Sequence, residues 1–470
     1  MTTPANATKQ GLSPLTLRDA ARGIRDGEFS AEDLAASCIG RMHAAEARVG
    51  AWAWFDEERA LERARAADRA RCEGRDAGPL HGIGIGLKDI IDARGLPTGM
   101  GSPIFAGRVA ERSAACVDKL EAAGAFVLGK TTTCEFATQH PPATTNPWNP
   151  LFTPGGSSSG SAAAVAAGFT LAALGSQTRG STIRPAAYCG VVGFKPSFGR
   201  VSRFGMLESS GSLDHLGLFT RSLDDAWLLT HLLQGPDARD PATREHAAWS
   251  GGAQPITSPA HPPRLAAVRT PAWDKADAAQ QALFAANCVA LRGAGADVAD
   301  IDLPDAFDEA DAVTRTLQVA EIARNFGALY ESDRHRMSAT FRALVERGAR
   351  VTTRDYECAL DVRGALQQSL AAFLAGYDAI VTPPATGEPP RTLGATGDAS
   401  FCAIWTLCGV PSVVFPTALG AQGLPMGLQV VAAHGKDRDV LEVASWCRAC
   451  LPFDFQPPLQ FEGAGHEQRA

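Results

Sequence analysis

Residues 154–161 have the sequence PGGSSSGS and run directly into an apolar, helix-like segment, Ala162–Ala167. The start of a helix presents unpaired N–H groups, and glycines let the backbone approach a ligand closely. A flexible linker seldom continues into an apolar helix, and a phosphate-binding P-loop needs a Gly-Lys-Ser/Thr sequence that is absent here. The stretch therefore indicates a ligand-facing turn at the start of a helix.

Two further clusters of small and polar residues flank this stretch. Upstream, residues 82–89 have the sequence GIGIGLKD, in which Lys88 closes an apolar run. The glycine spacing does not match the G-x-G-x-x-G fingerprint of dinucleotide-binding proteins. Downstream, residues 175–185 have the sequence GSQTRGSTIRP, with Ser181 twenty-four residues after Ser157. Taken singly, Lys88 would be a surface charge and Ser181 a turn residue, so only the combination points to chemistry.

The rest of the chain favours an α/β fold with helices on the faces of a sheet. From Leu80 onward, short apolar runs such as 83–87 and 125–128 alternate with helical segments such as 113–123. Later segments with strand patterns are 265–270, 378–382, 409–416 and 426–432. No internal repeat is evident.

We expect one α/β domain with additions at two places. Residues 16–70 have helical periodicity and predict an N-terminal helical layer over 1–70. The α/β domain then covers 71–465, and its part at about 235–376 is a variable, mostly helical insertion. The stretch 235–263, rich in Pro, Gly, Asp and Ser, marks the start of this insertion, and a split into two domains is the alternative.

The composition argues against several classes of function. The 470 residues carry a formal net charge of −7, and their Lys and Arg residues are scattered, which disfavours nucleic acid as a partner. Residues 1–15 lack the basic and apolar segments of a targeting sequence, and the longest apolar run, 162–175, is too short to cross a bilayer. We therefore expect a cytoplasmic protein that does not contact membranes.

The cysteines fit the same compartment. Eleven are spread from Cys38 to Cys450, an odd number at a density that suits reduced thiols. Cys447 and Cys450 form a C-x-x-C pair within a helical pattern, with no second pair at zinc-finger spacing. We interpret this pair as structural.

Together, the clusters closely resemble the amidase signature family. The resemblance covers most of the chain and rests on segments in the family's order and spacing: 80–89, 129–131, 155–161, 178–181, 189–196, and 409–411 with 427–429. It implies the amidase signature fold, an α/β architecture in which helices cover both faces of a large mixed β-sheet. It also implies hydrolysis of the carbon–nitrogen bond of a linear amide, with no metal or organic cofactor.

Position by position, the resemblance implies a catalytic triad. Ser181 is the nucleophile, Ser157 is the serine that follows a cis peptide bond, and Lys88 is the terminal base. These residue types suit the chemistry, because a serine nucleophile needs a base and no histidine lies in either Gly/Ser cluster. A buried lysine can be that base, since desolvation lowers its pKa from ~10.4 toward neutrality.

The loop expected to stabilise the oxyanion departs from the common family form. The resemblance implies that four successive backbone N–H groups hold the oxyanion, those of Thr178, Arg179, Gly180 and Ser181. Glycine is typical at the position of Arg179, whose N–H can still donate if φ is negative. Its guanidinium either forms a buried salt bridge or binds a substrate carboxylate, and we expect it to point into the pocket. Gln177 replaces a frequent aspartate, a change that we consider tolerable.

Three further residues are candidate substrate contacts. Arg184 binds either a substrate carboxylate or structural partners such as backbone carbonyls. Trp405 either lines the acyl pocket or belongs to the core. Ser158, next to the triad serine, is the third candidate, and Glu321 is a further residue that could face the site.

We expect a free-standing amidase that forms a covalent acyl-enzyme with a small-molecule amide. Carbamates, hydrazides and ureas undergo the same acyl-transfer chemistry and are alternatives. Another alternative is a glutaminase that works with a partner protein, similar to the A subunit of glutamyl-tRNA(Gln) amidotransferase. A binding protein that has lost catalysis is a third. Whether the chain forms a homodimer also stays open.

Overall fold

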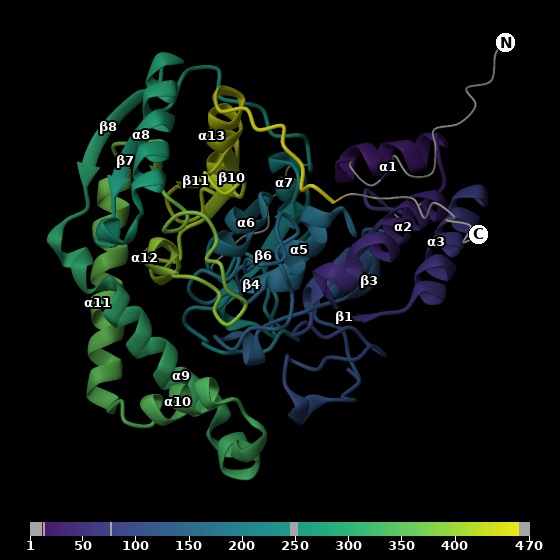
Figure 1. Ribbon diagram of the computed structural model, residues 1–470, viewed down its shortest axis with the longest axis horizontal. Helices are drawn as coiled ribbons and strands as arrows, with labels where there is room; N and C mark the ends of the chain where they lie inside the picture. The colour runs from purple at the N-terminus through teal and green to yellow at the C-terminus, as the bar shows by residue number, and fades with distance from the viewer. Residues whose placement is uncertain (1–11, 13–14, 76–77, 245–251, 460–470) are drawn as a thin grey trace, which may run out of the picture.

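The computed structural model describes residues 12, 15–75, 78–244 and 252–459. Within these ranges, eleven strands form one sheet and thirteen α-helices surround it (Figure 1). The strands are β1 (Trp52–Phe55), β2 (Gly84–Lys88), β3 (Phe126–Thr131), β4 (Ala173–Gln177), β5 (Val192–Lys195), β6 (His215–Thr220), β7 (Arg264–Arg269), β8 (Asp297–Asp302), β9 (Ala379–Thr382), β10 (Ser412–Leu419) and β11 (Pro425–Val431). The helices are α1 (Leu17–Asp26), α2 (Ala31–Val49), α3 (Glu57–Cys72), α4 (Ala115–Ala122), α5 (Ser159–Ala167), α6 (Ile183–Cys189), α7 (Leu223–Leu233), α8 (Ala278–Gly293), α9 (Ala310–Asp333), α10 (Ala339–Gly348), α11 (Thr353–Leu374), α12 (Ser400–Leu407) and α13 (Asp437–Cys450).

The sheet is mixed, and its central strands come from distant parts of the chain. The strand order is β1-β3-β2-β4-β6-β5-β10-β11-β9-β7-β8. β2 runs parallel to β3 and β4, and β7 runs parallel to β8 and β9, whereas the other neighbours are antiparallel. With helices packed over it, this sheet confirms the predicted α/β fold with a large mixed sheet.

Helix α5 shows how the small residues of the first cluster position the site. All of its residues are buried, and it packs against β2, β3, β4 and β6. A Cβ atom at Gly160 would lie 2.2 Å from the Ala51 carbonyl oxygen and 2.4 Å from the Thr132 amide nitrogen. Because these are backbone atoms, only glycine allows the helix to lie this close to β3. The glycine thus places the start of α5 beside the sheet.

Two strands occur where the sequence pattern favours helices. β1 lies between α2 and α3, inside the stretch 16–70, and β8 lies between α8 and α9. Both are edge strands, β1 paired with β3 and β8 paired with β7. A short edge strand is defined by its pairing with a distant strand, which local helical periodicity does not reveal.

Helices α9, α10 and α11 form a group that extends away from the sheet (Figure 1). α9 packs on α10, α11 and α12. The Phe136 ring lies 4.6 Å from that of Phe341 on α10 and 5.1 Å from that of Phe326 on α9, measured between centroids. This aromatic cluster joins the helical group to the segment that precedes the first Gly/Ser cluster. In the described ranges, no helix is long and apolar enough to span a membrane.

Candidate active site

Lys88, the last residue of β2, is fully buried and contacts two serine hydroxyls. Its Nζ donates to Ser157 Oγ and to Ser176 Oγ, each at 2.8 Å. Burial lowers the pKa of the Lys88 ammonium to about 7, and the negative charge of nearby Asp214 opposes this shift only in part. A substantial fraction of Lys88 is therefore a neutral amine near pH 7, the form that can accept a proton.

Ser157 lies between Lys88 and the start of α5. It is fully buried, and its peptide bond with Gly156 is cis. The Cys134 amide donates to the Ser157 carbonyl oxygen at 3.1 Å, and Arg184 Nη2 donates to the Gly156 carbonyl oxygen at 2.6 Å. The turn that carries Ser157 is thus held by backbone contacts on both sides.

Residues 178–181 connect β4 to the start of α6 and carry Ser181. Its hydroxyl forms no hydrogen bond with another described residue. In the same described part of the chain, the backbone N–H groups of Arg179, Gly180 and Ser181 donate to no acceptor. Arg179 is not among the non-glycine residues with positive φ, so its replacement of glycine introduces no backbone strain. Free N–H groups in one nearly buried loop can stabilise a developing oxyanion.

Gln177 supports this loop from the end of β4. Its Oε1 accepts hydrogen bonds from the amides of Thr182 and Ile183 at 2.8 and 3.0 Å. Its Nε2 donates to Thr406 Oγ1 at 2.9 Å, and Thr406 Oγ1 donates to the Arg179 carbonyl oxygen at 2.8 Å. An amide side chain supplies both the acceptor and the donor that this arrangement uses. Glutamine, unlike aspartate, has a side-chain N–H donor. Gln177 therefore also connects the loop to Thr406 on α12.

Asp214 holds the other end of the loop. Its Oδ1 accepts a 2.6 Å hydrogen bond from Thr178 Oγ1, and its Oδ2 accepts hydrogen bonds from the amides of Ser209 and Ser210 at 2.8 Å. Burial raises the pKa of the Asp214 carboxyl to about 6, although these hydrogen bonds favour its ionised form. Asp214 is thus a positioning group for Thr178, the first residue of the loop.

Two residues that contact the site, Ser176 and Asp214, were not predicted from the sequence. Ser176 lies within the second cluster, and its position just before the loop on a buried strand was the available signal. Asp214 lies outside all three clusters, just before β6, and nothing in its local sequence points to the loop. Asp214 comes close to the loop because β6, which follows Asp214, pairs with β4, which precedes the loop.

A cavity of about 370 Å³ opens at Ser181. Its walls come from the 178–181 loop, α9, α10, the 137–141 segment and the 394–399 loop. The lining residues are Ala137, Thr138, Gln139, His140, Pro141, Thr178, Arg179, Gly180, Ser181, Arg184, Arg315, Gln318, Thr340, Gly394, Ala395, Thr396, Gly397, Asp398 and Ala399. This size is typical of a site for a small molecule.

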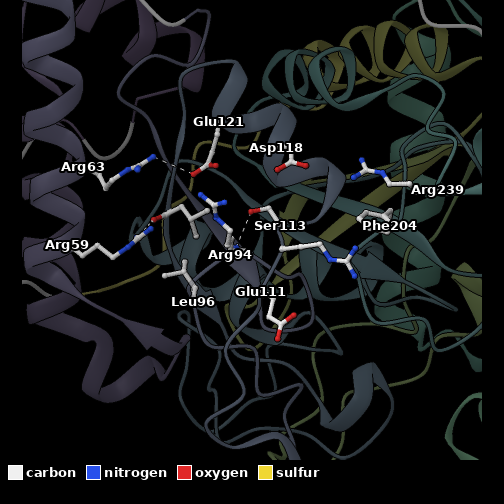
Figure 2. A pocket seen from close by; sticks show the side chains of 13 residues that line it. Arg59, Arg63, Arg94, Leu96, Glu111, Ser113, Asp118, Glu121, Phe204 and Arg239 are labelled. Atoms are coloured by element: carbon white, nitrogen blue, oxygen red, sulfur yellow. Dashed lines mark hydrogen bonds and ion pairs between the residues drawn. The ribbon is translucent and has the colours of Figure 1, made fainter.

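A larger cavity, of about 600 Å³, contains none of these residues (Figure 2). Its walls carry five arginines and three carboxylates: Arg59, Arg63, Arg94, Arg112, Arg239, Glu111, Asp118 and Glu121. Arg63 pairs with Glu121 at 3.4 Å, and the other acidic groups lie among the remaining arginines (Figure 2). Such mixed charges are usual for a hydrated surface, and volume alone does not mark this cavity as a catalytic site.

Arg184 lines the cavity at Ser181, but its guanidinium binds neutral acceptors. Its Nη1 donates to the Gly397 carbonyl oxygen at 2.9 Å, and its Nη2 donates to Thr396 Oγ1 at 3.1 Å. Together with its contact to Gly156, these bonds tie the 394–399 loop to the turn that carries Ser157. Its direct contact with substrate stays a prediction.

The other candidate substrate contacts do not line this cavity. Ser158 Oγ donates to the Ser176 carbonyl oxygen at 3.2 Å, and Trp405 is fully buried in the core around α12. Glu321 accepts hydrogen bonds from the Ser210 hydroxyl and from the Tyr356 hydroxyl, and thereby connects α9 and α11 to the segment before Asp214. The roles of Ser158 and Trp405 in substrate binding also stay predictions.

The family model for amidases matches residues 33–441, which include every residue of this site. The chain belongs to the amidase signature family. The predicted family is therefore confirmed, and as an amidase-family hydrolase the chain acts on carbon–nitrogen bonds.

Three proteins similar to this amidase-family chain match it over nearly their whole lengths. The A subunit of glutamyl-tRNA(Gln) amidotransferase from Koribacter versatilis is 32% identical over 472 residues, which cover 92% of this chain and 98% of that protein. The native peptide amidase of Stenotrophomonas maltophilia superposes with a TM-score of 0.84 at 27% identity, covering 96% and 99%. The 6-aminohexanoate cyclic dimer hydrolase in complex with its substrate gives a TM-score of 0.85 at 26% identity, with the same coverage.

Activity of this amidase-family chain is expected to rise with pH through a limb centred near 7. The pKa of Lys88 is lowered to about 7, and only the neutral amine accepts a proton, so activity increases as Lys88 loses its charge. Asp214, with a pKa of about 6, ionises at lower pH and would add a second, more acidic step. A profile of kcat/KM against pH from 5 to 10 measures the limb, and a rate that falls as pH rises through 7 would contradict the expectation.

Proposed function

We propose that the chain is an amidase that hydrolyses a small linear amide by acyl transfer to Ser181. Neutral Lys88 removes the proton of Ser157, and Ser157 removes the proton of Ser181 as its oxygen attacks the amide carbonyl. The N–H groups of residues 178–181 stabilise the oxyanion. The proton returns through Ser157 to the leaving amine, and water then hydrolyses the acyl-enzyme.

The observation that carries this proposal is the contact between Lys88 and Ser157. The 2.8 Å hydrogen bond joins a lysine with a pKa of about 7 to a serine hydroxyl, so the proton acceptor is in position near neutral pH. Among the described residues the Ser181 hydroxyl has no hydrogen-bond partner, and it lies in a cavity of about 370 Å³, which supports the role of nucleophile. The free N–H groups of the same loop support oxyanion stabilisation.

The proposal is tested by turnover and by covalent labelling of the purified chain. Ammonia release is measured on primary amides of graded acyl size, with a carbamate and a urea of matched size included as alternative substrates. A fluorophosphonate probe followed by peptide mass spectrometry locates the reactive serine. Labelling of Ser181 together with amide turnover supports the proposal, whereas a chain that neither turns over nor reacts favours a binding protein.

A second candidate function is that of one component of an amidotransferase. It is favoured by the similarity to the A subunit of glutamyl-tRNA(Gln) amidotransferase, which extends over nearly the whole of that protein. In this function the chain would release ammonia from glutamine for a partner protein. Glutaminase activity that appears only with a partner favours this function, whereas turnover of simple amides by the isolated chain favours the free-standing amidase.

Treatment with a metal chelator is expected to leave the activity unchanged. In the proposed mechanism Lys88 supplies the base and backbone N–H groups stabilise the oxyanion, so no step uses a metal ion. The measurement compares kcat/KM before and after incubation with EDTA followed by desalting. Loss of activity that zinc restores would replace the lysine-based mechanism with a metal-dependent one.

A further inference from the structure

The cavity at Ser181 has a chain of three charged groups on one wall. Asp311, at the start of α9, lies between Arg179 of the 178–181 loop and Arg315, one turn later on α9. Its Oδ1 accepts a 2.6 Å hydrogen bond from Arg179 Nη2, and its Oδ2 accepts two hydrogen bonds from Arg315, from Nε at 2.9 Å and from Nη2 at 2.5 Å. One carboxylate is thus shared by two guanidinium groups, both of which belong to residues that line the cavity.

The charges of the lining residues do not balance. Arg179, Arg184 and Arg315 are the cationic ones, and Asp398 is the carboxylate among them. Asp398 has its own cation outside the lining, because Lys275 Nζ lies 3.3 Å from it. Arg184 binds neutral acceptors, and Asp311 compensates one of the other two arginines. The wall therefore carries about two positive charges without matching carboxylates, next to the proposed nucleophile.

The two arginines on this wall differ in how accessible they are. The side chain of Arg179 is 14% exposed, and its Nε is buried without a hydrogen-bond partner. The side chain of Arg315 is 48% exposed, and α9 holds it at the edge of the cavity. Asp311 binds Nε and Nη2 of Arg315, so Arg315 can present mainly its Nη1 donors to a ligand, whereas Asp311 keeps the Arg179 guanidinium turned toward α9. The Nη1 donors of an arginine, together with the second N–H of Nη2, can bind a carboxylate.

We propose that this cavity selects amides that carry a free carboxylate, with Arg315 as the residue that binds it. The inference rests on the proposed amidase function and names its substrate class: monoamides of short dicarboxylic acids and related acidic amides. A substrate carboxylate supplies the negative charge that the wall lacks, and the interaction is strengthened because the cavity is only partly open to water. Asp311 competes with the substrate for the same guanidiniums and so limits the preference.

The test compares acidic and neutral amides of equal length on the intact chain. The acidic probes are the monoamides of the three- to six-carbon dicarboxylic acids, and the neutral probes are primary amides with the same number of carbons. A second pair, N-acetylglycine and N-ethylacetamide, places the carboxylate on the amine side. At low ionic strength we expect at least one acidic probe to exceed its neutral partner by about 10-fold or more in kcat/KM, and salt to reduce that ratio.

Variants of Arg315 and Asp311 test which residue causes the preference for acidic amides. Arg315→Gln is expected to lower the acidic-to-neutral ratio by about 10-fold or more while the neutral probes change little. Asp311→Asn removes the competing carboxylate and is expected to raise the ratio. Arg347→Gln, a replacement on an exposed part of α10 that does not line the cavity, is the matched control and should leave the ratio unchanged.

Failure of this inference is distinct from failure of the proposed function. Neutral amides preferred at every length, or an equal loss on both probe sets in Arg315→Gln, would overturn the acidic substrate class while leaving the amidase function intact. Turnover of none of the probes, with no fluorophosphonate label on Ser181, would overturn both. A preference shown only by the second pair would support the inference and place the carboxylate on the amine side.

Discussion

Replacement of Ser181 by alanine is expected to lower kcat/KM on the order of 10⁴-fold or more without a measurable loss of stability. In the proposed mechanism this oxygen forms the bond to the substrate, and nothing else in the site can replace it. Its hydroxyl makes no hydrogen bond within the described residues, so its removal leaves no buried group unsatisfied. Steady-state kinetics, fluorophosphonate labelling and thermal unfolding together check the result.

Ser161→Ala is the control for this variant because it alters a serine of the other cluster with a different role. The Ser161 hydroxyl contacts Thr131 Oγ1 at 2.7 Å and donates to the Leu174 carbonyl oxygen at 3.0 Å, both buried. Its loss is expected to cost about 1–3 kcal/mol of stability with turnover retained. If Ser181→Ala kept near-normal turnover, Ser181 would not be the nucleophile.

Replacement of Lys88 by methionine is expected to lower kcat/KM on the order of 10³-fold and to remove the pH limb near 7. Methionine has a similar length and cannot accept a proton, so the relay through Ser157 loses its base. The side chain is fully buried, which makes an apolar substitute of similar volume compatible with its surroundings. A kcat/KM profile that kept its limb near pH 7 in this variant would show that another group provides the base.

The same variant has a stability signature that reports the lowered native pKa of Lys88 independently of activity. The native pKa of about 7 lies below the usual value of ~10.4, so between these pH values the unfolded chain binds more protons than the native one. Native stability gains from this group as pH rises from about 7 to 10. Lys195 has a similarly lowered pKa but is present in both proteins, so it cancels in the comparison. Urea unfolding at pH 7 and 9.5 should show wild type gaining relative to Lys88→Met.

The triad candidates could be named because three compact local patterns together resemble the amidase signature family, and that resemblance implies the triad. Lys88 ends a strand whose apolar run is visible, and the order and spacing of the two Gly/Ser clusters match the family, which is what implies the roles of Ser157 and Ser181. The hydrogen bond between Lys88 and Ser157 joins two of these clusters, whereas the structure gives no hydrogen bond between Ser157 and Ser181. The catalytic role of the triad stays a prediction until the variants are measured.

The walls of the cavity could not be predicted in the same way. Arg315 and Thr340 come from helices whose exposed residues follow no motif, and the 394–399 loop has no regular periodicity. Their proximity to Ser181 depends on how α9 packs against α10 and α12, which tertiary contacts decide. The direction of the Arg179 side chain likewise depends on Asp311, whose sequence position gives no hint of that contact.

β10 and β11 lie inside the sheet but are synthesised last of its strands, which affects folding during translation. Lys195, at the end of β5, donates from its buried Nζ to the carbonyl oxygen of Val410, a contact that spans 215 residues of chain. When the ribosome has synthesised the chain as far as β9, all three triad candidates have been made. At that stage β5 still has an unpaired edge, and Thr406, which supports the 178–181 loop, has not yet been added. Pairings between such distant segments slow folding, and an open strand edge invites pairing with other chains. The newly made chain must be protected from aggregation until its last two central strands emerge.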